Sequence, residues 1–492
     1  MTIVGQFLIA TLLWASLGMA LSQELSQEDV SPLDPQEVLD SSVEHFPEIL
    51  EAMSRRRGLS GSLIEAEGAF DLVFEADGFA RATGFYDGTV LSGGVRQPFQ
   101  NFGGSVYSGY AISRGDFPIY EDEYFTSRGG KLKAGVVFSL LRDRLIDERR
   151  YDLADARLSE RASDFEVLAT KVGVQQRALL AYWRWVTAGQ NLAVYEELLR
   201  NAASRESALA RQVARGARAE IFLTENRQNI IRRMSLVTSA RRDFQVLGNQ
   251  LAFYYRDESG ELIVPDARRV PSSPTPESLN ELAVTQTISV SDAIERRPEL
   301  RLLRNGIERL RQRVLLQENA LKPRLDLNME ISRGLGGEGL GGPSRDETDT
   351  LIGFSFSVPL QRRSARGSLS RTRAELDAKE YQRQAVEEQL EVELENILLD
   401  LSFAQALVQL AAEEVGQAVI LRDAEQRRFE SGASDFFLVN VREETAADAR
   451  VRFYTAALET RIARANYDAA TMDLARLGIR DPRQARDLPP LD

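Results

Sequence analysis

The chain contains no cysteine and a single histidine, His45, among its 492 residues. The missing cysteines exclude disulfides, thiolate metal sites, cysteine nucleophiles and a lipid anchor on an N-terminal cysteine. Any Ser-His-Asp triad would have to use His45, and no predicted helix carries a two-histidine metal motif. With no catalytic constellation, no metal motif and no cofactor motif, the sequence does not predict an enzyme.

Positive charge and long apolar runs are also scarce. The chain has 61 Lys+Arg against 74 Asp+Glu, a net charge of −13, which argues against a nucleic-acid binder. Residues 3–21 are mainly apolar, and Gly18 and Ala20 frame a small-x-small cleavage site. This predicts a secretory signal peptide over residues 1–20, although its first residues lack Lys and Arg. An uncleaved anchor helix is the alternative, and no later run is long enough to span a membrane as a helix.

Proline is missing from two long stretches, between Pro118 and Pro265 and between Pro359 and Pro482. Because proline interrupts helices, these stretches can hold very long ones. The second stretch carries a heptad seam with 4-3 spacing, typical of coiled coils: Leu390, Leu394, Ile397, Leu401, Ala404, Val408, Ala411 and Val415. The predicted helices are two long ones at 147–213 and 365–429, two return helices at 219–255 and 434–477, and two short ones at 35–67 and 290–321.

Within this helical background, residues 324–333 alternate between polar and apolar side chains. Leu325, Leu327, Met329 and Ile331 fall on one face, and polar or charged residues fall on the other. This period of two predicts a strand with one apolar and one polar face. A length of about 10 residues is also that of a strand in a transmembrane β-barrel.

Three more segments alternate in this way, so the sequence predicts four membrane-type strands in two pairs. Their apolar positions are Phe70, Leu72, Phe74 and Ala76; Leu132, Ala134, Val136 and Phe138; and Ile352, Phe354, Phe356 and Val358. Glycine-rich polar stretches, 84–130 and 334–345, join the strands of each pair. Such long polar loops suit the outside of a membrane, and the longer one leaves room for extra strand.

The two halves of the chain repeat one plan. Pro298 follows Pro47 at an offset of 251, whereas Gly353 follows Gly135 at an offset of 218, so the first half holds 33 extra residues between its strands. Internal repetition of this kind usually means pseudo-symmetric packing. The predicted organisation is a signal peptide at 1–20, a tail at 21–34, a first repeat at 35–256, a proline-rich linker at 257–287, a second repeat at 288–478 and a tail at 479–492.

Four strands are too few to close a barrel in one chain. A lipid-exposed sheet edge is not tolerated, because its unpaired backbone groups are costly in hydrocarbon. Two copies would give eight strands and a filled interior, whereas three would give twelve strands and a lumen. The polar face favours a water-filled pore, and therefore a trimer.

Several short motifs lie along the two halves of the chain. They are the Pro-Glu-Ile/Leu boxes at 47–49 and 298–300, the strand-opening 321–325, the strand-closing 356–360, and the Gly-Ala turns at 216–217 and 432–433. Taken in order, these motifs resemble the TolC-type outer-membrane efflux protein family over about residues 36–478. The resemblance implies a mainly α fold with transmembrane β: a homotrimer with a 12-strand barrel and long antiparallel helical hairpins that form an α-barrel. It places the barrel in the outer membrane of a Gram-negative type cell and the helical tunnel in the periplasm.

The resemblance also implies partners: a periplasmic adaptor (membrane fusion) protein and an inner-membrane pump. The implied adaptor-contact residues at the helical tips are Gly216, Ala217, Gly432 and Ala433. Some family members close the periplasmic mouth with aspartates six and nine positions after the second tip glycine, where this chain has Leu438 and Val441. Asp435 is the nearest acid, with a role as mouth acid or as a helix N-cap.

The leading functional prediction is a passive exit duct without chemistry of its own. It is a trimeric outer-membrane channel for substrates delivered by a pump and adaptor, in efflux or in type I secretion. The alternative is a periplasmic coiled-coil adaptor or scaffold without a barrel. Adaptors usually carry a single hairpin between compact β-domains, whereas this chain repeats its hairpin and has strands of membrane pattern.

Overall fold

The computed structural model describes residues 31–118, 124–282, 289–339 and 347–480. The predicted signal peptide and most of the C-terminal tail lie outside the described residues. The chain divides into two compact units, each assembled from both halves of the sequence. Unit 1 comprises Met1–Phe46, Gln175–Thr285 and Leu398–Tyr467, and unit 2 comprises Pro47–Val174, Gln286–Ile397 and Asp468–Asp492. Within the described ranges, no helix is both long enough and apolar enough to cross a membrane.

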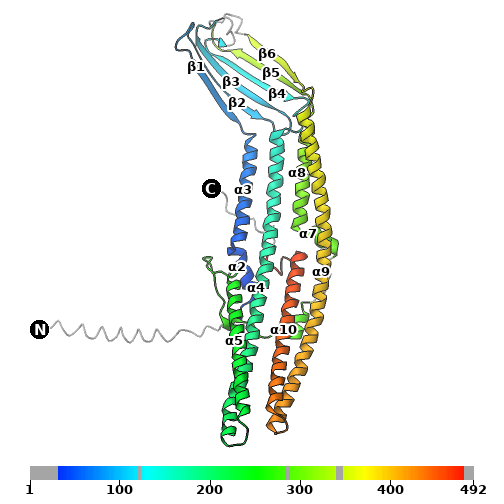
Figure 1. The fold of residues 1–492 in the computed structure, drawn as a ribbon. Helices are drawn as coiled ribbons and strands as arrows, with labels where there is room; N and C mark the ends of the chain where they lie inside the picture. The colour runs from blue at the N-terminus through cyan, green and yellow to red at the C-terminus, as the bar shows by residue number, and fades with distance from the viewer. Residues whose placement is uncertain (1–30, 119–123, 283–288, 340–346, 481–492) are drawn as a thin grey trace, which may run out of the picture. The chain divides into compact units, whose positions relative to one another are not determined.

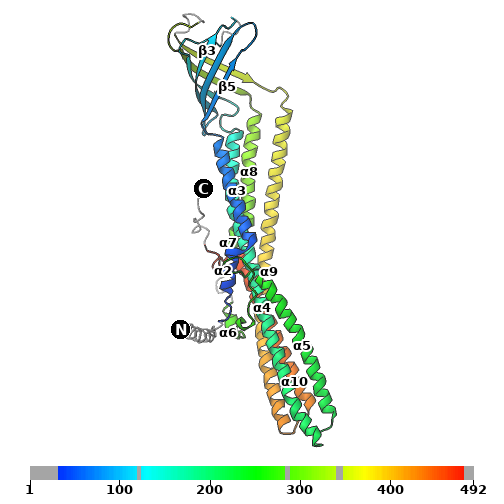
Figure 2. The same cartoon turned by 90° about the vertical axis from the view of Figure 1, so that its left-hand side faces the viewer.

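Two very long helices dominate the chain, α4 (Glu148–Ala214) and α9 (Arg363–Glu430), with 67 and 68 residues. Each is followed by a return helix, α5 (Ile221–Ala252) and α10 (Phe436–Ala470). In unit 1, α5 runs back along α4 and α10 runs back along α9, which makes two antiparallel hairpins (Figures 1 and 2). The predicted long and return helices are confirmed to within a few residues at most ends.

A proline breaks each of the two predicted short helices. The segment 35–67 forms α2 (Pro35–His45) and α3 (Pro47–Gly68), and 290–321 forms α7 (Val290–Arg296) and α8 (Pro298–Ala320). Phe46 and Arg297, which precede the prolines, are extended, with ψ of 123° and 126°. The proline ring disfavours a helical conformation in the residue before it, yet its fixed φ suits a first helical turn. The repeated Pro-Glu box is therefore a helix break.

The core of unit 1 lies between its two hairpins. Val194 and Leu198 of α4 pack with Val408 of α9 and Phe453 of α10. Leu279 of the short α6 (Pro276–Asn280) completes this cluster, and a 3₁₀ turn, η2 (Ala267–Arg269), lies earlier in the same connection. The predicted seam of α9 faces the core here: Leu401, Ala404 and Val408 are buried, and Ala411 and Val415 pack against it.

Unit 2 contains a row of four helical segments in the order α3, α4, α8, α9 (Figure 1). Each neighbouring pair is joined by ion pairs, which include Arg56–Asp164 at 2.5 Å, Arg309–Asp155 at 2.7 Å and Arg373–Glu318 at 2.7 Å. Ile294 and Leu300 also pack against Leu390 of the α9 seam. These contacts place the four segments side by side.

The same unit carries one antiparallel sheet with the strand order β1-β2-β3-β4-β5-β6. The strands are β1 (Val73–Ala80), β2 (Gly88–Pro98), β3 (Gly104–Gly115), β4 (Lys131–Ser139), β5 (Arg324–Gly334) and β6 (Thr348–Ser357). Strands β4 and β5 pair although they come from different halves of the sequence. We call the end of the sheet that joins the helices the helix end, and the opposite end the loop end.

The prediction of four strands is wrong, because the described residues alone form six. Strands β2 and β3 form a hairpin inside the stretch 84–130, and they account for most of the 33 extra residues of the first half. Glycines interrupt the apolar alternation of this hairpin at Gly93, Gly94 and Gly109. Glycine is a poor strand former and contributes no side chain to a face, so the period of two is weak there. The predicted twelve-strand barrel was counted from four strands in each of three copies, so it loses that basis.

Candidate functional site

One face of the sheet is apolar across all six strands. The pairing registers align its apolar side chains: Phe74 and Ala76 on β1, Leu91 and Val95 on β2, Val106 and Ile112 on β3, Val136 and Phe138 on β4, Leu327 and Met329 on β5, and Ile352 and Phe354 on β6. Within these strands, which are all described, its only charged residues are Arg114 and Arg333 near the loop end. An uncharged band with charges confined to one rim is the pattern of a lipid-facing wall.

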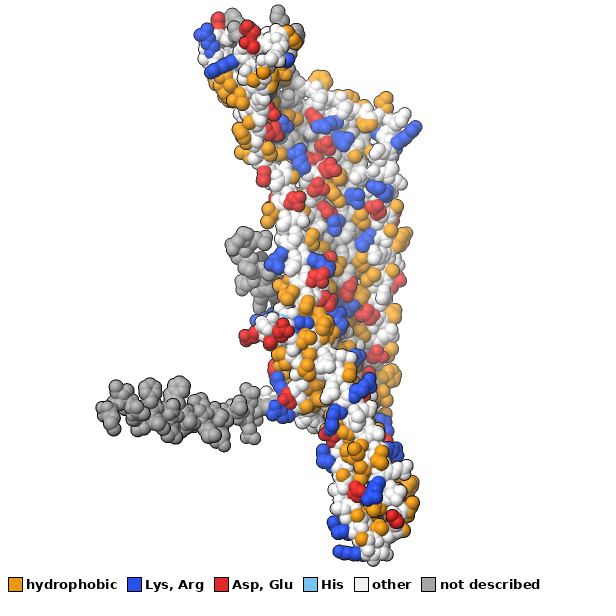
Figure 3. Space-filling model, turned by 60° about the vertical axis from the view of Figure 1, so that its left-hand side comes forward, with side chains coloured by type: hydrophobic (Ala, Val, Ile, Leu, Met, Phe, Trp, Pro, Cys, Tyr) orange, Lys and Arg blue, Asp and Glu red, His pale blue; other side chains and the backbone are white. Residues whose placement is uncertain are grey.

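This apolar face is uncovered in the single chain. Phe354, Phe74 and Ile352 are 81%, 71% and 67% exposed. In Figure 3, hydrophobic side chains spread over the sheet at the top of the view, and acidic and basic side chains gather at its loop end. Soluble monomers rarely expose a continuous apolar surface of this kind, so the face marks an interaction with lipid or protein.

The opposite face is polar and carries charges of both signs. Its charged residues are Glu75, Asp77, Arg96, Lys131, Lys133, Arg324, Asp326, Glu330 and Asp349. The Tyr107 hydroxyl donates to Glu330 Oε2 at 2.7 Å, reaching over β4 from β3 to β5. It can do so because Gly135 lies between them, where an added Cβ would come within 2.5 Å of the ring. This face can therefore border water.

Aromatic side chains cluster at both ends of the sheet. At the helix end, the ring of Phe99 lies 4.8 Å from Phe102 and 5.7 Å from Phe138. At the loop end, the chief ring contacts are Phe79–Tyr124 at 5.3 Å, Phe117–Phe125 at 5.4 Å and Tyr86–Phe117 at 5.7 Å. The helix-end cluster borders the apolar band through Phe138, which is the position of an aromatic girdle in a membrane barrel. The loop-end cluster lies on the polar face, because Phe79 shares the face of Asp77 and Phe117 covers Gly88.

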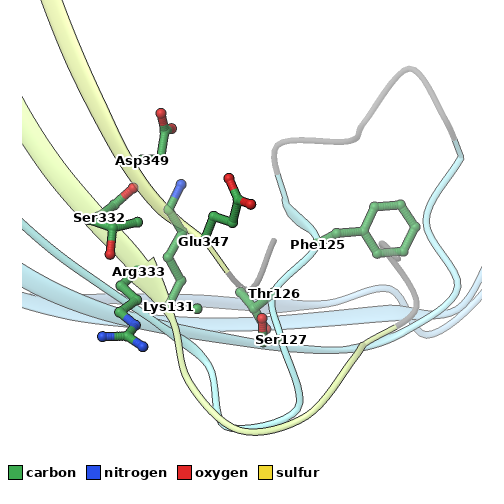
Figure 4. A pocket seen from close by; sticks show the side chains of 10 residues that line it. Phe125, Thr126, Ser127, Lys131, Ser332, Arg333, Glu347 and Asp349 are labelled. Atoms are coloured by element: carbon green, nitrogen blue, oxygen red, sulfur yellow. The ribbon is translucent and has the colours of Figure 1, made fainter. Parts of the chain in front are cut away.

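A cavity of about 250 Å³ opens at the loop end of the polar face. Figure 4 shows Lys131 of β4 extending to the side where Glu347 and Asp349 lie, whereas Phe125 points away. Glu347 and Asp349 are exposed to solvent. The cavity is thus continuous with the charged face and open to water, so it does not form a separate binding site.

The two predicted tips are the turns between the long helices and the return helices. Gly216 and Gly432 have positive φ of 67° and 76°, the left-handed conformation that glycine adopts without strain. Ala217 N–H donates to Gln212 O, and Ala433 N–H donates to Arg428 O in the same way. Both turns are therefore Schellman caps of identical hydrogen bonding. An added Cβ would meet nothing within 4 Å at either glycine, so the backbone conformation alone favours glycine there.

Asp435 caps the start of α10. Its carboxylate accepts the backbone N–H of Leu438 at 2.9 Å, and its side chain is exposed. This is the N-cap geometry that stabilises a helix by about 1 kcal/mol. The two residues in the family's aspartate positions, Leu438 and Val441, are themselves exposed apolar side chains.

A buried charge cluster, which the sequence patterns do not signal, lies near the tips within unit 1. Glu443 of α10 pairs with Arg205 of α4 at 2.6 Å and with Arg233 of α5 at 3.1 Å. The side chain of Arg233 is fully buried, and that of Glu443 is 9% exposed. Burial lowers the pKa of Arg233 from its usual value, and the charge of Glu443 opposes that shift. The cluster joins the first hairpin to the second.

The comparisons with known proteins agree on one class. Residues 289–477 match the family model described as outer membrane efflux protein, whereas no curated protein sequence matches the chain. The fold is similar to the outer-membrane channel OprN, with 16% identity, a TM-score of 0.62, and 89% of this chain and 90% of that chain covered. For VceC of Vibrio cholerae the values are 16%, 0.60, 89% and 95%. For the open state of MtrE of Neisseria gonorrhoeae they are 14%, 0.63, 90% and 89%.

The fold of the described chain is that of solved outer-membrane channels, and its sheet has one apolar and one charged face. Within the second half of the chain, the match to the outer membrane efflux protein family agrees with this likeness of fold to the TolC-type channels. This confirms the resemblance seen in the motifs.

Proposed function

We propose that the protein is a homotrimeric outer-membrane channel with a periplasmic extension. It gives passive exit to substrates that a periplasmic adaptor and an inner-membrane pump deliver, in efflux or in type I secretion. The observation that carries the proposal is the six-stranded sheet, whose one face is apolar, exposed and charged only near the loop end, while the other face is charged along its length. It supports a wall between lipid and water.

The open edges of the sheet support assembly from several copies. Strands β1 and β6 each pair on one side only, and all but one of their residues are exposed. Membrane barrels close because an unpaired edge in lipid is too costly. Since the sheet has six antiparallel strands, β6 of one copy and β1 of the next run antiparallel and can continue the ladder.

A second apolar stripe on α9 supports the same conclusion for the helical part. Leu399, Phe403, Leu407 and Leu410 lie on the side of α9 away from its buried seam, and each is 54–65% exposed. An amphipathic helix normally covers its apolar stripe, so this one needs a partner outside the chain. We propose that the neighbouring copy covers it.

Phe403→Asp is therefore expected to dissociate the trimer. Burying an unpaired carboxylate in each of three interfaces costs several kcal/mol per copy. The test is native mass spectrometry or cross-linking of the detergent-solubilised protein. Gln409→Asp, on the same helix at a half-buried polar position beside Asn280, is the matched control. A stable Phe403→Asp trimer would place the stripe outside the interface.

We propose that the tips, around Ala217 and Ala433, contact the adaptor, and this rests on the resemblance. A photo-cross-linking residue at Ala433 in the native host is expected to capture a periplasmic protein with a helical hairpin, identified by mass spectrometry. The same residue at Thr238, exposed in the middle of α5, is the control. Adducts at Thr238 but none at Ala433 would contradict the proposal.

Asp435 is a second proposal at the same tip, as an acid of the periplasmic mouth. Asp435→Asn keeps an oxygen that can accept the Leu438 N–H and removes the charge. If Asp435 is an acid of the periplasmic mouth, this variant is expected to lose cation selectivity in bilayer recordings. Its helix content is expected to stay unchanged. Unchanged selectivity would leave Asp435 as an N-cap only.

The experiment that tests the function as a whole has two parts. Outer-membrane extracts are expected to contain a heat-resistant trimer, and the purified trimer is expected to give stepwise conductance in planar bilayers. Recovery only as a soluble periplasmic monomer would overturn the proposal.

A further inference from the structure

We infer that the β2–β3 hairpin widens the channel, so that three copies build an eighteen-strand wall that admits bulkier hydrated solutes than a twelve-strand one. The inference rests on the proposed trimeric channel. Six strands per copy follow from the sheet order, and three copies then give eighteen. The strand count decides the outcome because barrel diameter grows roughly linearly with it.

The hairpin is part of the sheet and not a flap on its surface. Strand β2 pairs with β1 from Thr89 to Arg96 and with β3 along its whole length, and β3 pairs with β4 in turn. β2 and β3 thus lie between β1 and β4, the strands that adjoin α3 and α4 in the chain. If the hairpin folded away from the wall, the pairings of β2 with β1 and of β3 with β4 would both be lost.

The hairpin also spans the full height of the wall. Its turn reaches the helix end, where Phe99 packs on Phe138 and Gly103 N–H donates to Arg144 O at 2.9 Å. The other ends of β2 and β3 lie with the aromatic cluster of the loop end, where Phe117 packs against Tyr86 and Phe125. Short turns on the periplasmic side and longer loops outside are the rule for membrane barrels.

The two faces of the hairpin match those of the other strands. Leu91, Val95 and Val106 continue the apolar band, whereas Ser92 and Ala111 lie on the polar side. Tyr107 and Arg96 are a pair on that polar side as well. A hairpin that folded into the lumen or over the outer surface would have no reason to keep an uncharged band in register with its neighbours.

The width of the sheet matches the width of the helix row below it in unit 2. Helices packed about 8–10 Å apart give four of them an arc of roughly 32–40 Å. Strands about 4.8 Å apart and tilted about 40° each occupy roughly 6.3 Å of arc. Six strands therefore span roughly 38 Å, whereas four would span only about 25 Å. With the hairpin, the wall does not narrow where helices give way to strands.

The consequence is a wider lumen. At equal tilt, eighteen strands instead of twelve increase the diameter about 1.5-fold, and the cross-section about 2.2-fold. Barrels of 16–18 strands are the class that leaves an open aqueous channel. The protein is thus suited to hydrated solutes of large diameter.

The test removes the hairpin by excising residues 81–114. Ala80 pairs with Thr89, which pairs with Arg114, so Ala80 stands level with Arg114 on the same face. Joining Ala80 to Gly115 lets β1 take the place of β3 beside β4 without changing which face any side chain points to. Because the chain has no cysteine, Ser355→Cys on the polar face provides a single thiol in both chains.

The readout is the largest maleimide-linked polyethylene glycol that reaches this thiol from the loop side of the reconstituted trimer. Because the polymer enters from the loop side, the cut-off measures the width of the barrel and does not depend on whether the periplasmic mouth is open. The hydrodynamic diameter of the cut-off is expected to fall about 1.5-fold on excision. An equal cut-off in both chains overturns the inference and leaves the proposed channel standing. A two-copy assembly by native mass spectrometry overturns the inference together with the proposed trimer. A full-length trimer whose thiol reacts with no polymer, or no oligomer at all, contradicts the proposed function instead.

A second measurement uses the full-length chain alone, so it tests the inference even if the excision variant fails to assemble. Nitroxide labels at Leu91→Cys and Val106→Cys are expected to collide preferentially with oxygen dissolved in lipid. Labels at Ser92→Cys and Ala111→Cys are expected to collide preferentially with an aqueous nickel chelate. If all four positions meet only the aqueous reagent, the hairpin lies outside the wall and the inference is wrong.

Discussion

Glu443→Gln is expected to destabilise the packing of the two hairpins in unit 1 by about 3–5 kcal/mol, the usual cost of removing one partner of a buried ion pair. The substitution leaves Arg233, whose side chain is fully buried, and Arg205, 16% exposed, without their shared anion. The amide keeps nearly the same volume, so the loss is electrostatic and not a cavity. Arg233 keeps its bond to the Leu198 carbonyl, at 2.8 Å, but loses its only ion-pair partner among the described residues.

Hydrogen–deuterium exchange of α5 and α10 measures this effect, since local opening sets the exchange rate. A cost of 3 kcal/mol or more corresponds to at least about 100-fold faster exchange of the amides near the cluster. Glu444→Gln is the matched control at the next residue. Glu444 pairs with Arg232 at 3.4 Å, and Arg232 is 65% exposed, so the change is expected to cost less than about 1 kcal/mol. Equal exchange in the two variants would show that water reaches the cluster and screens it.

The helical part of the fold could be predicted because its signals are local. A missing proline and a repeated heptad fix a helix within its own sequence, so α4 and α9 and the Leu390–Val415 seam are found where the pattern places them. The breaks at Pro47 and Pro298 were predictable in principle from the same chemistry. The two breaks were not predicted because the apolar pattern continues across both prolines.

The sheet could be predicted only in part. Strands β5 and β6 have side chains that alternate cleanly, whereas β2 and β3 include glycines that carry no information about a face. The 33-residue difference between the halves was the available signal, but length alone does not separate a loop from a hairpin. The Glu443 cluster had no local signal, because its three residues are distant in sequence and meet only when the hairpins pack.

Phe354→Arg is expected to impair insertion of the protein into the outer membrane. Phe354 lies in the middle of β6 on the apolar face, between Ile352 and Phe356, and is 81% exposed in the single chain. An arginine at the midplane of a lipid-facing strand costs about 2–4 kcal/mol, and each of three copies would bear that cost. Folding of the purified chain into lipid vesicles under a denaturant titration measures the loss of stability directly.

Ser355, the next residue in β6, provides a matched control for this prediction. Ser355 follows Phe354 in β6 but points to the polar face, opposite Asp326 of β5. Ser355→Arg adds the same charge at the same depth, where it meets water and the acidic side chains of that face, and is expected to change stability by well under about 1 kcal/mol. A period of two predicts opposite outcomes for adjacent positions, and a soluble sheet gives no reason for them. Equal tolerance of arginine at both positions would mean that the exposed apolar face does not meet lipid, so the channel wall would have to be abandoned.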